Sequence, residues 1–569
     1  VDVWRNTITF VADDAITTSS SNESMHTEQT ETLANFHTPN SIERKKVYLA
    51  EYPTVITSTG RRKPDVNKAI VDGLNEGSLI INYIGHGNPQ LWAHENVFVR
   101  ETTIPQLHNK ERLVFVVAAT CDFSRFDEPG ERSSAEMLEI KENGGGIGCL
   151  SATRGVFSTS NALFNYAFFD RLFERDSEGR TQRLGDAVSN LKQTFSSEND
   201  QKYFLLGDPV MRLLVPPNVA TIDSINGRTL QASVQLKALS RIRIDGTVRK
   251  PDGTAWTDFD GRALLEVFDS ERTRSIQDGQ VTLNFTVPGG TIYRGENSVT
   301  GGKFSANFIV PKDISYENRS GRINLYFWNE GTDGTGFTQN ITVGGTDTTA
   351  AADIEGPRIN IYLDNLSFRP GDLVNDNPLL IVDLVDESGI NTSGASIGHR
   401  LEAWLDNSTQ SIDLTSSYRG KIDNSQEGVA EHRLSGLAPG QHSVRVRAWD
   451  AYNNSSTHEV SFSVASGSRL NVVNIYNFPN PFSGSTTFTF QHNQLLPVDV
   501  EVKIYTLAGR LIETIEARNL TDRFVRIPWN GRDRDGDDIA NGVYFYKVIV
   551  KTQDGQLSDE SLGKLTVLR

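Results

Sequence analysis

A histidine and a cysteine each end an apolar run of the sequence. His86 follows "SLIINYIG", and Cys121 follows "RLVFVVAAT". A cysteine at neutral pH is mostly a thiol, so it becomes an efficient nucleophile only when an imidazole or a dipole favours the thiolate. His86 is the candidate base for Cys121. Together they would form the reactive pair of a covalent mechanism.

The segments that carry these residues are typical of a parallel α/β sheet. From residue 1 to about 216, apolar runs such as "TITFVADD" alternate with segments of helical spacing such as "VNKAIVDGLNEG". This alternation predicts parallel strands with helices on both faces. The carboxyl ends of such strands share one edge, and neighbouring strands lie about 5 Å apart. His86 and Cys121 can therefore meet there.

Glycines flank the histidine on both sides. Gly85 and Gly87 place no side chain beside His86, which would let a substrate backbone approach. The Gly87 N–H would also be free to point at a carbonyl oxygen. Together with the Cys121 N–H, it could form an oxyanion hole.

Both the cysteine and the histidine could instead have purely structural roles. A cysteine after an apolar run is more often a small buried residue than a nucleophile, and a lone histidine is usually structural. The joint pattern of His86 and Cys121 favours catalysis. Cys149 in "GGGIGCLSA" is predicted to be a buried thiol. With two cysteines in the chain, neither a disulfide framework nor a zinc site of paired thiolates is expected.

The motifs "YIGHG", "AATC" and "LLGDPVMRLLVP" resemble the gingipain family, peptidase family C25, of the caspase-like cysteine peptidases. The resemblance implies that Cys121 is the nucleophile and His86 the general base. The family also places an acid ahead of the histidine. Its counterparts here are Asp14 in "FVADD" and Glu23, with His26, in "ESMH". We take Glu23 as the third catalytic residue, which would orient His86.

The acidic residues have other interpretations. The loop "AITTSSSNES" departs from the gingipains in length and composition. Asp13, Asp14 and Glu23 could equally bind calcium or cap a helix. Asp13 and Asp14 are the candidate metal ligands, although the predicted mechanism requires no cofactor. The resemblance also assigns a specificity pocket, without a preferred side chain, to Thr153, Arg154, Gly155, Val156 and Phe157.

After Pro216 and Pro217 the sequence changes to short period-two strands separated by turns such as "NGRT" and "PDGT". We predict a multidomain chain: an α/β caspase-like catalytic domain, then three all-β immunoglobulin-like sandwiches. The predicted boundaries are 1–217, 218–345, 353–466 and 470–569. The chain begins at Val1 within a predicted strand, without an initiator Met or a signal peptide. We therefore expect the catalytic domain to be N-terminally incomplete.

Two of the β modules add a more specific resemblance. "GPRINIYLDNLSFRPGD" and "LAPGQHSVRVRAWDAYNNSS" closely resemble the module that follows the peptidase domain in the PorU family of type IX secretion sortases. "NFPNPFSGSTTFTF" and "WNGRDRDGDDIANGVYFYKVIV" are similar to the C-terminal sorting domain of type IX substrates. His399 is interpreted as structural because no cysteine accompanies it. Asp533, Asp535 and Asp537 begin like a calcium loop, but without its final Glu a solvated turn is favoured.

These resemblances imply a two-step acyl transfer. Cys121 would cleave the C-terminal signal domain from a type IX cargo protein, and an amine on anionic lipopolysaccharide would then accept the cargo. The implied partners are cargo C-terminal domains, the outer-membrane barrel PorV, and PorQ and PorZ. The implied location is the cell surface, peripheral on the outer membrane of a Gram-negative bacterium of the Bacteroidetes type. The alternatives are a secreted gingipain-like endopeptidase and a catalytically inactive surface-binding protein.

The bulk composition excludes some other functions. A formal net charge of -16 argues against nucleic acid as a partner, because binding to phosphates depends on clustered Lys and Arg. The sequence contains no run of about 18 apolar residues, so no membrane-spanning helix is predicted.

Overall fold

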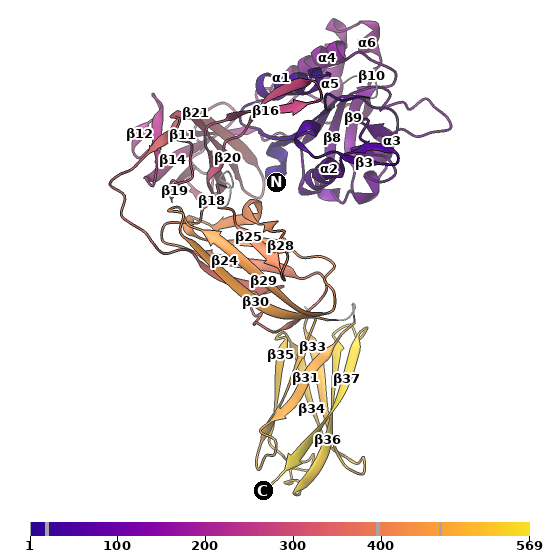
Figure 1. The fold of residues 1–569 in the computed structure, drawn as a ribbon, viewed down its shortest axis with the longest axis vertical. Coiled ribbons are helices and arrows are strands. Elements are labelled where there is room, and N and C mark those ends of the chain that lie inside the picture. Colours follow the sequence, from indigo (N-terminus) through magenta and orange to yellow (C-terminus); the bar gives the residue numbers. More distant parts are fainter. Residues whose placement is uncertain (1, 18–21, 394–398, 466–468, 495) are drawn as a thin grey trace. The chain divides into compact units, whose positions relative to one another are not determined.

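The computed structural model describes residues 2–17, 22–393, 399–465, 469–494 and 496–569. The chain forms two compact units. The first comprises Val1–Val310 and Ile314–Ala350, and the second comprises Pro311–Asp313 and Ala351–Arg569. Figure 1 shows helices and strands together at the amino-terminal end of the chain and strands alone toward the carboxyl end. The four predicted domains remain predictions, and the last boundary, between 466 and 470, falls partly on residues 466–468, outside the described part.

The first unit opens with a six-stranded sheet in the order β10-β9-β8-β5-β1-β2. Its strands are β1 (Thr7–Ala12), β2 (Glu43–Tyr48), β5 (Ile80–Ile84), β8 (Val114–Ala119), β9 (Gly146–Ala152) and β10 (Tyr203–Gly207). All neighbouring pairs are parallel except β9 and β10. The predicted parallel sheet is thus present. Its last strand is antiparallel because the chain re-enters beside Thr153, whose N–H donates to the Lys202 carbonyl just before β10.

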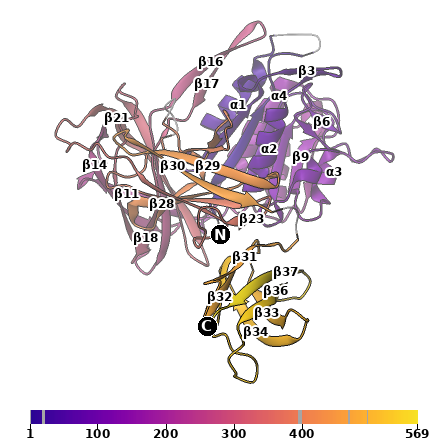
Figure 2. The same ribbon diagram turned by 60° about the horizontal axis from the view of Figure 1, so that its bottom comes forward.

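Helices cover both faces of this sheet (Figure 2). They are α1 (Met25–Phe36), α2 (Pro64–Glu76), α3 (Ser134–Glu139), α4 (Ser158–Leu172), α5 (Leu184–Thr194) and α6 (Glu198–Gln201). Residues of a strand point alternately to opposite faces. Ile8 and Phe10 therefore join the core under α1, α4 and α5, whereas Val11 joins the core under α2 and α3. Two small hairpins pair β3 (Val55–Thr57) with β4 (Gly60–Arg62) and β6 (Leu91–Trp92) with β7 (Phe98–Val99).

The rest of the first unit contains a nine-stranded sheet in the order β12-β11-β14-β19-β18-β15-β20-β21-β13. The bounds are β11 (Asn218–Ile225), β12 (Arg228–Thr229), β13 (Val234–Ala238), β14 (Arg241–Arg249), β15 (Gly261–Phe268), β18 (Thr291–Thr300), β19 (Lys303–Ile309), β20 (Arg319–Trp328) and β21 (Asp333–Thr346). β11 also pairs with β21, so the sheet closes on itself. This closure differs from the expected two-sheet sandwich. It is possible because β21 is long enough to pair with both β11 and β13 along one side.

One hairpin of this segment packs on the six-stranded sheet and its helices. β16 (Arg272–Asp278) and β17 (Val281–Val287) pair only with each other among the described strands, and β17 contacts α1. Both views show the hairpin beside α1 (Figures 1 and 2). Leu283 and Phe285 are buried in the same core as Phe10 and Phe169, and Phe285 meets the ring of Tyr48 edge-on. The hairpin is therefore part of the core of the six-stranded sheet.

The second unit contains two pairs of sheets. In residues 358–464, one sheet has the order β22-β24-β28-β27 and the other β23-β30-β29-β25-β26, and they share a core. These strands are β22 (Arg358–Leu363), β23 (Leu373–Val374), β24 (Leu379–Val385), β25 (Glu402–Leu405), β26 (Ile412–Asp413), β27 (Tyr418–Lys421), β28 (Asn424–Arg433), β29 (Gly440–Trp449) and β30 (Ser455–Val464). Two sheets around one core form a sandwich.

Residues 472–567 form the second pair of sheets, in the orders β31-β32-β35 and β34-β33-β36-β37. Their strands are β31 (Val472–Phe478), β32 (Thr486–His492), β33 (Val498–Thr506), β34 (Leu511–Leu520), β35 (Phe524–Trp529), β36 (Gly542–Thr552) and β37 (Ser558–Val567). Asp533 lies in an exposed turn and accepts the N–H groups of Asp535 and Asp537. Within the described residues, no helix has the length and apolar character needed to cross a membrane.

We predict that Phe285→Ala destabilises the core of the six-stranded sheet. Truncating a fully packed Phe typically lowers the free energy of unfolding by about 3–5 kcal/mol. The measurement is calorimetric unfolding of the first unit. Ile56→Ala is the matched control, since Ile56 is 75% exposed on the β3–β4 hairpin. Equal stability of the Phe285 variant and the wild type would show that the hairpin does not belong to this core.

Candidate active site

The backbone of His86 is held from both sides. Its N–H donates to Asp13 Oδ2 at 2.9 Å, and its carbonyl accepts from the Ala93 N–H at 2.9 Å and from the Tyr83 hydroxyl at 2.6 Å. Asp13 follows β1 directly, and β1 pairs with β5 so that Ala12 lies opposite Ile84. The register of two parallel strands therefore places this carboxylate under the histidine.

The glycines beside His86 are required by packing. A Cβ at Gly85 would lie 2.5 Å from the Asp13 Cβ, and a Cβ at Gly87 would lie 2.6 Å from Thr120 Oγ1. We expected these glycines to admit a substrate backbone. In the structure they instead let Asp13 and Thr120 approach the chain. The contact at Gly87 also places the His86 loop directly against the loop that carries Cys121.

Cys121 lies at the same sheet edge as His86. β5 and β8 pair with Ile84 opposite Ala119, and His86 and Cys121 each come two residues later. The Val156 N–H points at Cys121 Sγ, with a nitrogen–sulfur distance of 3.4 Å. Cys121 Sγ also lies 3.6 Å from the Val156 carbonyl oxygen, to which the thiol can donate. No hydrogen bond joins Cys121 to His86 among the described residues. Such catalytic contacts often tighten only when substrate binds.

Glu23 reaches the histidine. Its Oε2 lies 2.8 Å from His86 Nε2. Glu23 comes just before α1, and its N–H donates to the Ala15 carbonyl at 3.1 Å. A carboxylate here fixes the orientation of the imidazole and stabilises its protonated form. Because Nε2 is engaged by Glu23, Nδ1 is the nitrogen left to exchange a proton. The structure thus brings Glu23 to His86, while the catalytic roles of both remain predictions.

The ring of His26 packs beside the Glu23–His86 pair. Its ring packs edge-on against His86 with the centroids 5.2 Å apart, and its Nε2 lies 3.7 Å from Glu23 Oε2. Burial lowers the pKa of His26 to about 4. The ring is therefore uncharged at neutral pH and does not compete as a cation for Glu23.

The two N–H groups proposed for the oxyanion hole belong to Gly87 and Cys121. The bridge between Gly87 and Trp92 uses the Asn88 N–H and the Ala93 N–H. Among the described residues, neither the Gly87 N–H nor the Cys121 N–H donates a hydrogen bond. Both donors are therefore available to a substrate carbonyl, as an oxyanion hole requires. Their role stays a prediction.

The predicted pocket segment, residues 153–157, touches the nucleophile through one residue. Val156 contacts Cys121 Sγ through its N–H and its carbonyl oxygen. Arg154 forms an ion pair with Asp127, and both side chains are about half exposed. The segment therefore lies beside Cys121, with a charged pair at its solvent side.

The other members of this segment differ in exposure. Thr153 is buried and donates its N–H to Lys202, while Phe157 is exposed. A Cβ at Gly155 would meet no heavy atom within 4 Å. The Gly155 backbone and the Phe157 side chain thus border open space, and either residue can contact a bound peptide.

The candidate metal ligands lie in a buried network with cations. Carboxylate oxygens of Asp13, Asp14 and Glu95 lie within 4.8 Å of one another. Arg61 contacts Asp14 at 2.9 Å and Glu95 at 3.2 Å, and Lys63 contacts Asp14 at 3.3 Å. Burial raises the pKa of Asp13 and of Glu95 to about 7. Arg61 and Lys63 supply the positive charge that calcium would bring, which favours an ion-pair network over a metal site.

The remaining histidine and cysteine noted in the sequence are structural. Cys149 is buried, and burial raises the pKa of its thiol to about 12. His399 hydrogen-bonds to Asp313 and packs against Trp449 with the ring centroids 4.2 Å apart. The other residues of its motif, 394–398, lie outside the described part of the chain. Neither residue contributes to the site of His86.

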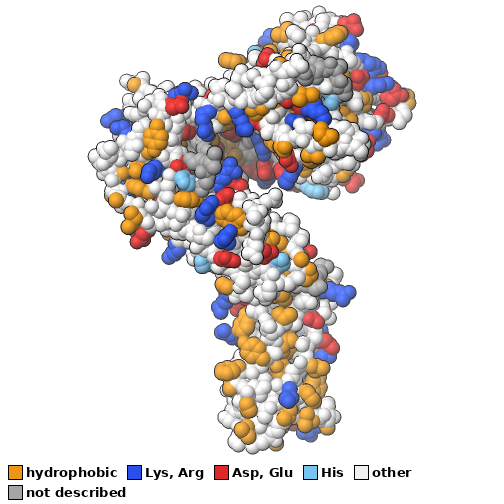
Figure 3. Space-filling view, in the orientation of Figure 1, with side chains coloured by type: hydrophobic (Ala, Val, Ile, Leu, Met, Phe, Trp, Pro, Cys, Tyr) orange, Lys and Arg blue, Asp and Glu red, His pale blue; other side chains and the backbone are white. Residues whose placement is uncertain are grey.

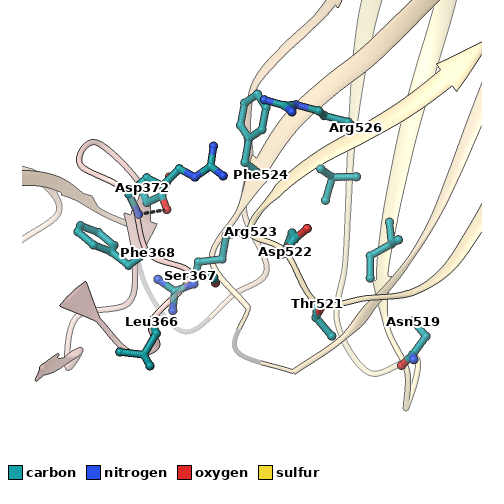
Figure 4. A pocket seen from close by; sticks show the side chains of 13 residues that line it. Leu366, Ser367, Phe368, Asp372, Asn519, Thr521, Asp522, Arg523, Phe524 and Arg526 are labelled. Atoms are coloured by element: carbon teal, nitrogen blue, oxygen red, sulfur yellow. Dashed lines mark hydrogen bonds between the residues drawn. The ribbon is translucent and has the colours of Figure 1, made fainter.

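The second unit contains a cavity of about 460 Å³ between the segments 366–372 and 519–526 (Figure 4). Arg523 lies in its wall and is held by an ion pair with Asp364. Neither His86 nor Cys121 lines this cavity, and its walls offer no thiol or imidazole. On the face drawn in Figure 3, Lys and Arg side chains are interspersed with Asp and Glu and form no single basic patch.

A thiol and a carboxylate-held imidazole at the edge of a parallel sheet define a cysteine-peptidase site. Residues 1–214 match the model of peptidase family C25, a segment that contains Glu23, His86 and Cys121. Residues 1–214 therefore have the fold of a C25 cysteine peptidase. No curated protein sequence matches the chain.

Solved structures with similar folds were also found. One is dimeric latent PorU from Porphyromonas gingivalis, with 28% identity, 74% of this chain and 41% of that chain covered, and a TM-score of 0.32. Another is the Arg-specific cysteine proteinase gingipain R (RgpB), with 17% identity, 60% and 67% covered, and a TM-score of 0.30. The chain thus spans about two fifths of the PorU chain. The peptidase assignment comes from the family match.

Sequence reasoning missed the residues that hold the site. Asp13 appeared only as a metal ligand, although it anchors the His86 backbone, and Tyr83 was not considered. The signal for Asp13 was available: an acid directly after β1 must lie beside the end of whichever strand pairs with β1. Tyr83 gave no such signal, because it lies within an otherwise apolar strand.

We predict that Glu23→Gln lowers the reactivity of Cys121. The amide keeps a hydrogen-bonding group but loses the charge that stabilises the imidazolium, and the loss of one pKa unit corresponds to about a tenfold smaller thiolate fraction. The rate of alkylation by iodoacetamide at pH 6, followed at Cys121 by mass spectrometry, should fall about tenfold. The exposed Glu28 on α1 provides the control Glu28→Gln. An unchanged rate in the Glu23 variant would remove Glu23 from the catalytic set.

We predict that Glu95→Gln changes how stability depends on pH. The pKa of Glu95 rises from 4.5 to about 7, so the folded state holds a proton that the unfolded state releases. Its contribution to stability is complete below pH 4.5 and is lost as the pH rises through about 7. The wild type should therefore lose more stability than the variant between pH 4.5 and pH 8, measured by calorimetry of the first unit. Exposed Glu142→Gln should behave as wild type.

Proposed function

We propose that the chain is the catalytic portion of a type IX secretion sortase, a cysteine transpeptidase. It cleaves C-terminal signal domains from cargo and attaches the cargo to cell-surface lipopolysaccharide. The observation that carries acyl transfer is the Glu23–His86 hydrogen bond of 2.8 Å at the sheet edge of Cys121. The choice of a sortase is supported by the resemblance of residues 353–466 to a module of the PorU family and of residues 470–569 to type IX sorting domains.

The proposed reaction has two steps. The Cys121 thiolate attacks the peptide carbonyl ahead of the signal domain, and the Gly87 and Cys121 N–H groups stabilise the oxyanion. Protonated His86, held by Glu23, gives its proton to the leaving amine, and a thioester remains. His86 then removes a proton from the incoming amine of lipopolysaccharide. The amine attacks the thioester carbonyl, an amide forms, and the Cys121 thiolate is released.

The whole proposal includes partners and a location. Cargo proteins bind through their C-terminal domains, and PorV, PorQ and PorZ join the enzyme at the cell surface, peripheral to the outer membrane. The sandwiches predicted at 353–466 and 470–569 would act as immunoglobulin-like modules that, together with the closed sheet of residues 218–345, position the peptidase there. No cofactor is required, and a calcium ion near Asp13 and Asp14 would have to displace Arg61 and Lys63 from Asp14. The resemblance supports these partners. The experiment must distinguish transfer of the acyl group to an amine from its transfer to water.

A gingipain-like endopeptidase is the second candidate. The family match over residues 1–214 supports it equally, because the same residues would pass the acyl group to water. The third, an inactive surface-binding protein, is favoured by the missing hydrogen bond between His86 and Cys121. Reactivity of Cys121 separates this third candidate from the other two.

We predict that Cys121→Ala in the complete parent protein blocks cargo processing. Cargo should accumulate with its signal domain attached, as measured by immunoblot of cell fractions. Buried Cys149→Ala is the matched control and should process cargo normally. Normal processing in the Cys121 variant would refute the sortase. The purified enzyme is also incubated with cargo and lipopolysaccharide together. Cleaved cargo that carries no lipopolysaccharide would show that the protein is an endopeptidase.

A further inference from the structure

The hairpin β16–β17 contacts the loop that carries the catalytic acid. Asp278, the last residue of β16, accepts the Ala15 N–H on its Oδ2 at 2.7 Å, and both residues are buried. Ala15 in turn accepts the Glu23 N–H on its carbonyl at 3.1 Å. Glu23 then holds His86 through its side chain. A continuous set of hydrogen bonds therefore runs from a residue far along the chain to the catalytic imidazole.

The β16–β17 hairpin is held in place by contacts of its own with the rest of the first unit. Leu283 and Phe285 are buried in the peptidase core. The Thr286 N–H donates to Glu31 Oε2 at 2.8 Å, and Lys46 Nζ donates to the Thr286 carbonyl at 2.7 Å. These contacts reach α1 and β2, which are separate from the loop that carries Ala15. The position of Asp278 is thus determined independently of the loop.

The residues before and after Ala15 in this loop have further contacts. Asp14 pairs with Arg61 and Lys63, and the Ile16 carbonyl accepts from Arg61. These bonds hold the first part of the loop. Ala15 is the residue that donates its N–H to Asp278 of the hairpin and accepts the Glu23 N–H on its carbonyl oxygen. A buried N–H without an acceptor is costly, so loss of the Asp278 carboxylate would force Ala15 to move.

We propose that Asp278 is a positioning residue for the Glu23–His86 pair, acting through Ala15. The β segment that follows the peptidase sheet is then part of the catalytic apparatus. The inference rests on the proposed role of Glu23 as the residue that orients His86. It assigns Asp278 no contact with substrate. A small displacement of Glu23 is sufficient for an effect, since catalytic geometry is sensitive to shifts of about 1 Å.

The test compares Asp278→Ala with Asp278→Asn in the full chain. Alanine removes the acceptor, while the amide oxygen of asparagine can still accept the Ala15 N–H. Alkylation of Cys121 by iodoacetamide is measured from pH 5 to pH 9. The alanine variant should react about tenfold more slowly at pH 6 and reach half its maximal rate about one pH unit higher. The asparagine variant should stay within about threefold of wild type.

A double-mutant cycle identifies the route of the effect. If Asp278 acts through Glu23, then Asp278→Ala should add less than about twofold in the Glu23→Gln background, because coupled residues are not additive. Arg274→Ala is the matched control. Arg274 lies on the same strand and pairs with Glu51, so its variant should keep the wild-type pH profile. A fully additive effect of the two substitutions would overturn the proposal.

A second measurement keeps the outcome independent of the enzyme's function. Hydrogen exchange of the Ala15 and Glu23 amides should be at least about tenfold faster in Asp278→Ala, while the amides of β5 exchange as in wild type. An unreactive Cys121 in the wild type would refute the proposed function alone. Unchanged exchange at Ala15 and Glu23, or faster exchange with an unchanged alkylation profile, would overturn the role of Asp278.

Discussion

The hydrogen bond from the His86 N–H to Asp13 Oδ2 is the constraint on which the site depends. It joins the ends of β1 and β5, two neighbouring parallel strands between the helix layers. Asp13 also accepts the Asp14 N–H, so both of its oxygens are used by the backbone. A buried carboxylate is stabilised by such donors. The same carboxylate thereby fixes the direction in which the chain leaves β1 and the position of His86 after β5.

This arrangement has an electrostatic cost. Burial raises the pKa of Asp13 and Glu95 to about 7, even with Arg61 close to Glu95 and Asp14. Three acids and two bases are thus kept in a small volume under the catalytic loop. Asp13 and Asp14 are hydrogen-bonded, whereas the buried carboxylate of Glu95 makes no hydrogen bond among the described residues and is balanced by the charge of Arg61. Moving Asp13 or Asp14 would leave further buried polar groups unpaired, which keeps this region rigid. Rigidity here serves His86, whose ring must stay between Glu23 and the thiol.

The sequence predicted those parts of the fold that depend on local pattern. The apolar runs of β1, β5 and β8 and their common edge follow from strand periodicity, and they place His86 and Cys121 together. Glu23 came from family resemblance, because no periodicity links a loop acid to a histidine. β2 was missed because "ERKKVY" is charged. It is an edge strand, and Glu43 and Lys46 use their charges to contact Arg322 and Thr286.

Long-range contacts account for the rest. The pairing of β11 with β21 closes a sheet, and Asp278 reaches Ala15, but neither contact leaves a pattern in a single segment. A hairpin that alternates polar and apolar residues is compatible with many partners. Its choice of partner is decided by the shape of the peptidase core, where Leu283 and Phe285 complete the packing. Such choices require the folded neighbours to be known.

Exposure of the imidazole bears on the choice between transfer and hydrolysis. The His86 side chain is 41% exposed, so water reaches it in the free enzyme. A thioester at Cys121 would then be hydrolysed unless something covers the ring, since transfer to an amine requires that water be excluded. The rings of His26 and His94 pack against the imidazole with centroids 5.2 Å and 5.1 Å away, and they still leave 41% of the His86 side chain exposed. Under the proposed transfer reaction, the bound cargo or the acceptor must therefore supply the cover, and specificity for the acceptor would arise in the complex.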